Sequence, residues 1–188
     1  KTGCLGISRV MAEPGFDPKR PTKKRKNPLL YRCHFGDDVV SILGSYEADC
    51  GGVDSLPSYE VTFGLIRAEH AAGNHVLLEG LLLSHDKKQF TQLWEWLRLR
   101  GQRDQLHILE LVEPLETCLA SVKERRARKG ADPDTFDPEN TIRRYKEVVS
   151  SCKQLEERGV GTVHRVTRAT VVPTVLGLLG LREEVLAA

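Results

Sequence analysis

The fold prediction depends most on one stretch of the sequence, His75-Val76-Leu77-Leu78-Glu79-Gly80-Leu81-Leu82-Leu83. From residue 76 to residue 83 it is a nearly continuous apolar run, interrupted only by Glu79 and Gly80. Such a run is typical of a strand that is covered on both faces, as in a parallel sheet. The first half of the run closes on Glu79, and a carboxylate at a strand end supplies the kind of oxygen ligand that a magnesium ion needs.

Strand-like and helix-like segments alternate along the rest of the chain. Short apolar runs between turn residues predict strands at residues 29–35, 39–43, 106–112 and 162–166. Helical spacing of apolar residues predicts helices near residues 5–11, 58–70, 90–97, 115–122, 142–155 and 171–181. This alternation implies an α/β fold in three layers, a parallel sheet with flanking helices and right-handed crossovers. No repeat or long linker divides the chain, so we expect one domain over residues 1–188.

The composition is that of an ordinary globular protein, with 188 residues, 40% hydrophobic and 29% charged. No apolar stretch approaches the roughly 20 residues that span a bilayer, and the first residues do not resemble a signal peptide. We therefore expect a cytoplasmic protein with no membrane partner. The five cysteines are widely spaced without a C-x-x-C pair, which predicts reduced and mostly buried thiols. A net charge of +2 is too small to indicate a polyanionic partner by itself.

The chain opens on Lys1-Thr2, the pair that ends a phosphate-binding loop of the G-x-x-x-x-G-K-[ST] type. In such folds a central strand comes immediately before the glycine loop. We therefore expect the native gene to encode a strand and a glycine-rich loop before Lys1. The alternative interpretation is a frayed N-terminus with a stray lysine.

Three stretches of the sequence resemble the uridine kinase and phosphoribulokinase branch of P-loop kinases. The run HVLLEGLLL (residues 75–83) is similar to a strand and turn of that branch. The stretch ELVEPLETCLASVKERRARKG (110–130), followed by FDPENTIRRYKEVV (136–149), looks like its strand, helix, arginine-bearing lid and returning helix. Small phage and bacterial P-loop ATPases are similar as well. Residues 14–57 do not align with the nucleoside kinases, so the resemblance does not carry over an acceptor substrate.

The resemblance implies a fold of the P-loop NTPase and nucleoside kinase type, with ATP as phosphoryl donor and Mg²⁺ as cofactor. Lys1 is then expected to bind and activate the transferring phosphate, and Thr2 to offer its hydroxyl to the metal. Glu79 is expected to hold the metal, usually through water. The alternative for Glu79 is a surface charge where its strand leaves the sheet.

The resemblance also implies a lid at about residues 124–144 that carries arginines. Arginines that fold over a moving phosphoryl group stabilise the transition state more than the ground state. Arg126 and Arg128 are the expected catalytic members and Arg125 an expected nucleotide ligand, with Arg143 and Arg144 on the far side of the lid. Alternatively, these arginines are solvated cations that favour a helix C-terminus through its dipole.

Acidic residues follow the predicted strand 39–43, where open α/β sheets place their ligands. Glu47, Asp49 and Asp54 lie there, and a carboxylate near an acceptor hydroxyl assists its phosphorylation. Asp54 is the expected catalytic residue, because the glycines at 51 and 52 allow the backbone to approach a ligand closely. A turn with an aspartate cap is the alternative. Tyr46 is a candidate for stacking on a base or sugar, or for simple packing.

Two functions stay open at this point. The first is an ATP-dependent kinase acting on a hydroxyl or phosphate acceptor such as a nucleoside or nucleotide. The second is a nucleic-acid-modifying or nucleic-acid-binding P-loop protein, whose basic tract at residues 19–26 contacts phosphates with six cations in eight residues. A solvated loop is the alternative for the tract, and a P-loop-derived module without catalysis is a third reading. Trp96 is expected to be partly exposed, which suggests a homodimer surface.

Overall fold

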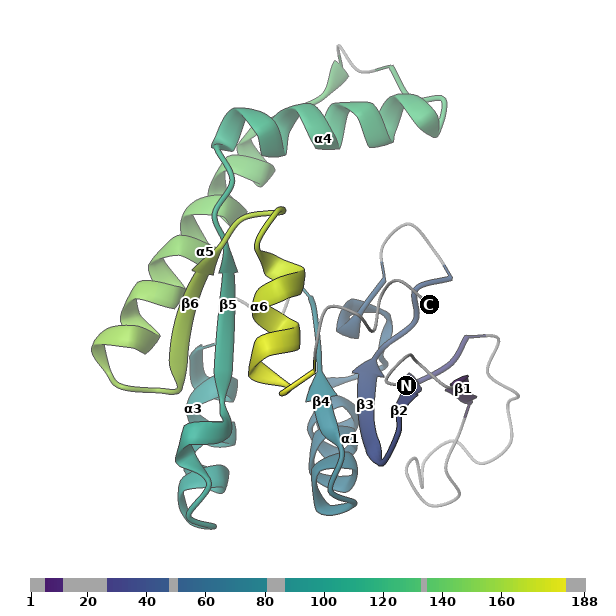
Figure 1. Cartoon of the computed structure of the whole chain (residues 1–188). Helices are drawn as coiled ribbons and strands as arrows, with labels where there is room; N and C mark the ends of the chain where they lie inside the picture. The colour runs from purple at the N-terminus through teal and green to yellow at the C-terminus, as the bar shows by residue number, and fades with distance from the viewer. Residues whose placement is uncertain (1–5, 12–26, 48–50, 81–86, 133–134, 182–188) are drawn as a thin grey trace. The chain divides into compact units, whose positions relative to one another are not determined.

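The computed structural model describes residues 6–11, 27–47, 51–80, 87–132 and 135–181. Its contacts group the chain into two compact units, residues 1–83 with 175–188 and residues 84–174, which are described in turn (Figure 1). Lys1, Thr2, Asp49 and the basic tract at 19–26 lie outside the described residues. The single domain over residues 1–188 stays a prediction.

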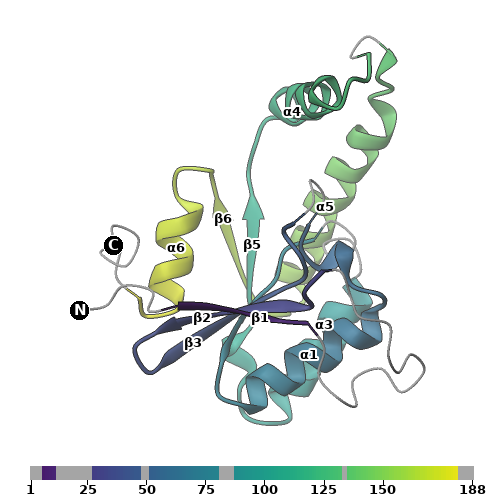
Figure 2. The same ribbon diagram turned by 90° about the vertical axis from the view of Figure 1, so that its right-hand side faces the viewer.

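The first unit is built on a four-stranded sheet in the order β1-β2-β3-β4. β1 (Gly6–Val10), β2 (Leu30–Phe35) and β3 (Asp38–Leu43) pair antiparallel, whereas β3 and β4 (His75–Leu77) pair parallel. Helix α1 (Tyr59–Ala71) connects β3 to β4 and covers one face of this sheet (Figure 2). The α/β class is thus confirmed, and the parallel arrangement holds for the β3–β4 pair.

Two expectations for this unit were wrong. Residues 6–10 form a strand and not a helix, because Gly6 disfavours a helix and the β-branched Ile7 and Val10 suit a strand that pairs with β2. The sheet is antiparallel from β1 to β3, because only Gly36 and Asp37 separate β2 from β3. A two-residue turn, made here with a positive φ of 65° at Gly36, joins only antiparallel strands.

Helix α1 begins and ends as its sequence predicts. The Ser58 hydroxyl accepts a hydrogen bond from the Val61 amide at 3.3 Å, which caps the first turn. Phe63, Leu65 and Ile66 face the core of the first unit, together with Leu30 and Leu43 of the sheet. The chain then turns at Gly73, whose φ is 82°.

A buried carboxylate ties α1 to the sheet. Glu69, 2% exposed, accepts hydrogen bonds from Arg32 (2.6 and 3.0 Å), Ser41 (2.6 Å) and Asn74 (2.7 Å). Burial by itself raises the pKa of Glu69, but these hydrogen bonds and the charge of Arg32 outweigh it and lower the pKa below the ordinary value. Because its partners come from β2, β3 and the residue before β4, Glu69 joins α1 to the strands of this sheet.

The second unit contains the parallel pair β5 (His107–Leu111) and β6 (Thr162–Val166). Between these strands the chain forms α4 (Leu115–Arg128) and then α5 (Glu139–Glu157), which runs back beside β6 (Figure 1). Helix α3 (Lys87–Arg98) and the short turn η2 (Arg103–Gln105) precede β5. Leu97, Ile108 and Leu155 lie in the core of this unit.

The expected lid is more helical than its polar sequence suggested. Residues 124–128 continue α4, because Glu, Arg and Ala are good helix formers, and residues 139–144 begin α5. The structure describes every residue of α4, and none of these residues is buried. Figures 1 and 2 show that α4 extends beyond the carboxyl end of β5, away from the strand pair.

The last described helix, α6 (Val171–Leu178), contains the boundary between the two units. Within the described residues, Cys33, Cys118 and Cys152 are free thiols, and two of the three are buried. Burial and the nearby Glu110 carboxylate raise the pKa of the Cys152 thiol to about 11, so this thiol stays protonated. None of the helices in the described part of the chain is long and apolar enough to cross a bilayer.

Candidate functional site

The candidate site lies at the carboxyl ends of the parallel strands β3 and β4 in the first unit. After β3 the chain turns back on itself, and Ser45 and Gly52 form an antiparallel bridge with a hydrogen bond from the Gly52 amide to the Ser45 carbonyl at 3.0 Å. The short turn η1 (Val53–Ser55) follows, and the Val53 amide donates to the Glu79 carbonyl at 2.8 Å. The loop after β3 is therefore fastened to the chain that leaves β4.

The glycines of this loop allow that close approach. Gly52 has a φ of 69°, and a Cβ on it would collide with the backbone carbonyl of Glu79. A Cβ on Gly80 would collide with the Val53 side chain and lie 2.8 Å from Oδ1 of Asp54. The sequence analysis expected the glycines at 51 and 52 to allow a ligand close to the backbone; in the structure they lie against neighbouring backbone carbonyls, those of Ser45 and Glu79. The consequence is that Asp54 packs directly against the Glu79-Gly80 peptide.

Tyr46 is the residue of this site whose role the sequence did not reveal. Its hydroxyl donates a hydrogen bond to the Glu79 carboxylate, and its ring lies 6.1 Å from the ring of Tyr31. The Tyr31 hydroxyl in turn accepts from the Tyr46 amide at 3.3 Å. Partial burial, followed by the charge of Glu79 and the hydrogen bond to it, raises the pKa of Tyr46 to about 12. Tyr46 therefore stays protonated at neutral pH and is a hydrogen-bond donor to Glu79.

At this sheet edge the Tyr46 and Glu79 side chains therefore interact, and Asp54 lies beside the Gly80 backbone that follows Glu79. Both carboxylates belong to exposed residues. Glu47, another acidic residue after β3, instead pairs with Arg9 at 3.3 Å. Among the described residues no three His, Cys, Asp or Glu side chains gather closely enough to hold a metal ion by themselves. The arrangement offers two oxygen-donor side chains and a hydroxyl to a ligand that brings further oxygens.

The lid arginines lie on α4 in the second unit, and the structure distinguishes among them. Arg125 and Arg128 are exposed in the last turn of the helix. Arg126 lies with its guanidinium carbon 6.0 Å from the centre of the Phe136 ring, and its Nε is buried without a hydrogen-bond partner among the described residues. Arg126 therefore packs α4 against the α4–α5 connection, and Arg125 and Arg128 present their charge to solvent.

A second group of interacting polar side chains joins the ends of β5 and β6. Arg168, after β6, pairs with Glu113, after β5, at 3.5 Å and donates to the Ser121 hydroxyl of α4 at 3.3 Å. The sequence analysis missed both charged residues. The signal was available for Glu113, which follows an apolar strand as Glu79 does.

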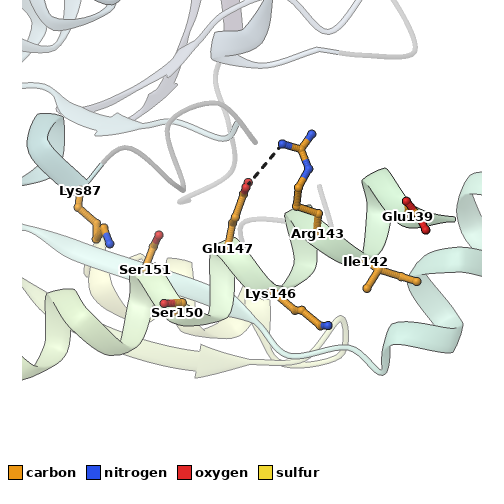
Figure 3. A pocket seen from close by; sticks show the side chains of 8 residues that line it. All are labelled: Lys87, Glu139, Ile142, Arg143, Lys146, Glu147, Ser150 and Ser151. Carbon is orange, nitrogen blue, oxygen red and sulfur yellow. Dashed lines mark ion pairs between the residues drawn. The ribbon is translucent and has the colours of Figure 1, made fainter.

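An open groove of about 760 Å³, here called the α5 groove, runs along the first two-thirds of α5 (Figure 3). Its wall is completed by the first residue of α3, whose side chain points toward α5. The lining residues are Lys87, Glu139, Ile142, Arg143, Lys146, Glu147, Ser150 and Ser151. Seven of the eight lining residues are polar or charged, among them three cations and two carboxylates.

The tryptophans of α3 carry arginines on their faces. Arg98 lies 5.8 Å from the centre of the Trp94 ring, and Arg100 lies 4.2 Å from that of Trp96. Trp96 is half-buried, as expected for a partly exposed ring. A homodimer through this side of α3 stays a prediction.

Comparison with known proteins relates the chain to a phage enzyme. No family model matches the chain, and no solved structure is similar to it. The chain is 36% identical over 141 residues to a protein of Pseudomonas phage PaMx11 named 5-hmdU DNA kinase, and the match covers 74% of this chain and 71% of the phage protein. On this identity and coverage, the chain belongs to the family of that phage kinase and is a phosphotransferase.

Proposed function

We propose that this kinase transfers the γ-phosphoryl group of ATP to the hydroxymethyl group of 5-hydroxymethyl-dU in DNA. The phage relative is named for that acceptor, which supports the same acceptor class here. The observation that carries the proposal is the placement of Glu79 and Asp54 together at the carboxyl ends of β3 and β4, where α/β sheets bind their ligands. We further propose that the fold is of the P-loop kinase type, in three layers.

The donor set of this edge fits a magnesium ion. Mg²⁺ is usually bound by one or two carboxylates, with the remaining oxygens from water and substrate phosphates. Glu79 meets this requirement, and its orientation is held by Tyr46. When bound, the metal neutralises charge on the phosphates during transfer. Lys1 and Thr2 are assigned to the phosphates and the metal on the sequence motif alone.

Asp54 is assigned to the acceptor. The hydroxymethyl oxygen attacks the γ-phosphorus, forming a new P–O bond while the bond to the bridging oxygen of ADP breaks. Asp54 accepts the proton that the hydroxyl loses. Asp54 lies on the short turn η1, which is hydrogen-bonded to the Glu79 backbone through the Val53 amide. This contact holds the proposed proton acceptor at a fixed position relative to the proposed metal ligand.

Arg125 and Arg128 are assigned to the charge that develops on the phosphoryl group, within a lid at about residues 124–144. Their exposure supports this role. Arg126 is retained in the lid, where its contact with Phe136 supports the helix end.

The test measures phosphoryl transfer from γ-labelled ATP to an oligonucleotide that contains one 5-hydroxymethyluracil and has both terminal hydroxyls blocked. The matched acceptor carries thymine at that position, which has a methyl group and no hydroxyl. We expect label only in the first oligonucleotide, and loss of labelling with Asp54→Asn. Equal labelling of both, or of neither, would contradict the proposed acceptor. Labelling of the free nucleoside alone would assign the enzyme to small molecules.

A further inference from the structure

We propose that the α5 groove binds the phosphodiester backbone of the DNA acceptor. This inference rests on the proposed function, because it concerns how a polymeric acceptor is held outside the reacting site. It assigns a role to Lys87, Arg143 and Lys146, which lie on a different unit from Glu79 and Asp54.

The first argument is the charge that remains after internal pairing. Glu147 is bound by Arg144 at 2.9 Å, whereas its nearest approach to Arg143 is 3.9 Å. Arg143 donates a shorter hydrogen bond, 2.8 Å, to the neutral amide of Asn140. Figure 3 shows Arg143 and Glu147 extending to the same side of α5. Since Arg144 already compensates Glu147, Arg143 retains charge for an anionic ligand.

The two lysines are not neutralised by carboxylates. The Lys87 ammonium donates to the Gln154 side-chain oxygen at 2.7 Å, and Gln154 donates to the Ser150 hydroxyl at 2.9 Å. A neutral amide thus orients Lys87 and leaves it two N–H groups for a phosphate. Lys146 is exposed, and no carboxylate of the described residues lies within ion-pair distance of it.

The position of the groove suits a substrate strand. α5 ends shortly before β6 begins and packs along it, so the first residues of α5 lie toward the carboxyl ends of β5 and β6. Ligands of α/β sheets bind at that edge. Arg143, Lys146 and Ser150 follow one another over about 10 Å of helix, at 1.5 Å per residue. That length accommodates more than one phosphate of a strand.

The geometry favours a phosphodiester chain over a nucleotide triphosphate. Triphosphates are typically cradled by backbone amides of a glycine loop or a helix N-terminus. The α5 groove instead offers separate side-chain cations along the flank of a helix, a pattern that tracks a backbone without reading its sequence. Salt-sensitive binding with little base preference is the expected behaviour.

The experiment measures binding of a fluorescent single-stranded oligonucleotide without the modified base, by anisotropy at several salt concentrations. Lys87→Ala combined with Lys146→Ala is expected to weaken binding about 10-fold at low salt and to reduce the log–log salt slope by about 1.4, or roughly 0.7 for each lost contact. Lys153→Ala is the matched control, because Lys153 is an exposed lysine of the same helix beyond the groove. This control should bind as the parent does. Lys146→Glu, a surface change that spares the Lys87–Gln154 contact, should weaken binding further than Lys146→Ala.

Several results would overturn the groove assignment. These are no oligonucleotide binding by the parent at low salt, equal loss in the Lys153→Ala control, or an unchanged salt slope in the double variant. A raised KM for ATP with an unchanged KM for the oligonucleotide would assign the groove to nucleotide instead. Because the binding assay uses no modified base and no phosphoryl transfer, it remains decisive even where the proposed acceptor fails. Normal oligonucleotide binding without phosphoryl transfer to 5-hydroxymethyluracil would contradict the proposed acceptor but would leave the groove assignment in place.

Discussion

At the scale of single residues, Glu79 is the side chain on which the proposed chemistry depends most. We predict that Glu79→Gln lowers kcat by about 100-fold or more, or about 2.7 kcal/mol, and changes the Kd for ATP less than about 3-fold. The reason is that a neutral amide positions the metal poorly during transfer, while most of the nucleotide affinity comes from elsewhere. Steady-state kinetics and nucleotide titration measure the two quantities. Glu60→Gln, an exposed carboxylate in the first turn of α1, is the control. Equal turnover in Glu79→Gln and the parent would remove Glu79 from the site.

Tyr46 gives a prediction with a spectroscopic readout. Tyr46→Phe keeps the ring beside Tyr31 but removes the donor to Glu79, so we expect kcat to fall about 10-fold, as for a lost hydrogen bond to a charged group. A pKa raised to about 12 favours the protonated phenol in the folded state. This contribution to stability is therefore present below pH 10 and is lost as the pH rises toward 12. Ultraviolet titration should show a tyrosine that ionises near pH 12 in the parent and is missing in the variant. A parent in which every tyrosine ionises near pH 10 would contradict the contact.

Glu69 is a structural counterpart, and its prediction concerns stability. Glu69→Gln replaces a charged acceptor of Arg32, Ser41 and Asn74 by a neutral amide. We expect a loss of about 2–3 kcal/mol, near the lower end of the range for a broken buried ion pair, because Arg32 is 30% exposed. Because the pKa of Glu69 is lowered in the folded protein, its contribution to stability is complete above the unfolded pKa of about 4.3. It is lost as the pH falls through the lower folded value. Urea unfolding at pH 7 and at decreasing pH should show the two proteins converging in acid. A constant difference down to pH 2 would exclude the charge as the cause.

At the scale of elements, the α4–α5 segment carries the prediction of a lid. α4 has no buried residue, and near its end Arg126 contacts the Phe136 ring. Few contacts therefore hold the segment in place. We expect amides between residues 124 and 144 to gain protection from hydrogen exchange when a non-hydrolysable ATP analogue binds. A lid that closes only over nucleotide excludes water and limits wasteful hydrolysis. The amides of α1 provide the internal reference. Unchanged protection at saturating analogue would remove Arg125, Arg126 and Arg128 from the site.

The elements themselves were predictable wherever local signals agreed. Ser58 and Pro114 begin α1 and α4 as expected, and the apolar runs at 106–112 and 162–166 contain β5 and β6. The misses have local causes as well. Residues 6–10 contain too few apolar positions to distinguish the periodicity of a helix from that of a strand. These residues form a strand because they pair with β2. The run at 76–83 gave a described strand of only three residues, because the chain leaves β4 to accept the Val53 amide.

At the scale of the whole molecule, the sequence indicated two candidate carboxylates but not the side chains that lie beside them. Glu79 and Asp54 follow strands, and the rule that α/β sheets bind ligands at carboxyl ends indicated both. Tyr46 was not predictable as a partner of Glu79, since 33 positions separate them and only the parallel β3–β4 pairing brings them together. The mixed sheet was not predicted either. The alternation of strands and helices along the sequence indicated a parallel sheet, whereas the two-residue turn between β2 and β3 makes this pair antiparallel.

The basic tract at residues 19–26 concerns the whole molecule, because we propose it as a second set of cations for a polymeric acceptor. The tract lies outside the described residues, so this prediction rests on its six cations. We expect replacement of Lys23, Lys24, Arg25 and Lys26 by Ala to weaken oligonucleotide binding and to flatten its salt dependence, because fewer counterions are released. Four lost contacts would reduce the log–log slope by about 2.8 on a single strand. Combining these changes with the Lys87 and Lys146 variant tests independence: two surfaces on one strand should lower the slope additively. A parent-like slope in the tract variant would make the tract a solvated loop and leave the α5 groove as the proposed contact with the strand.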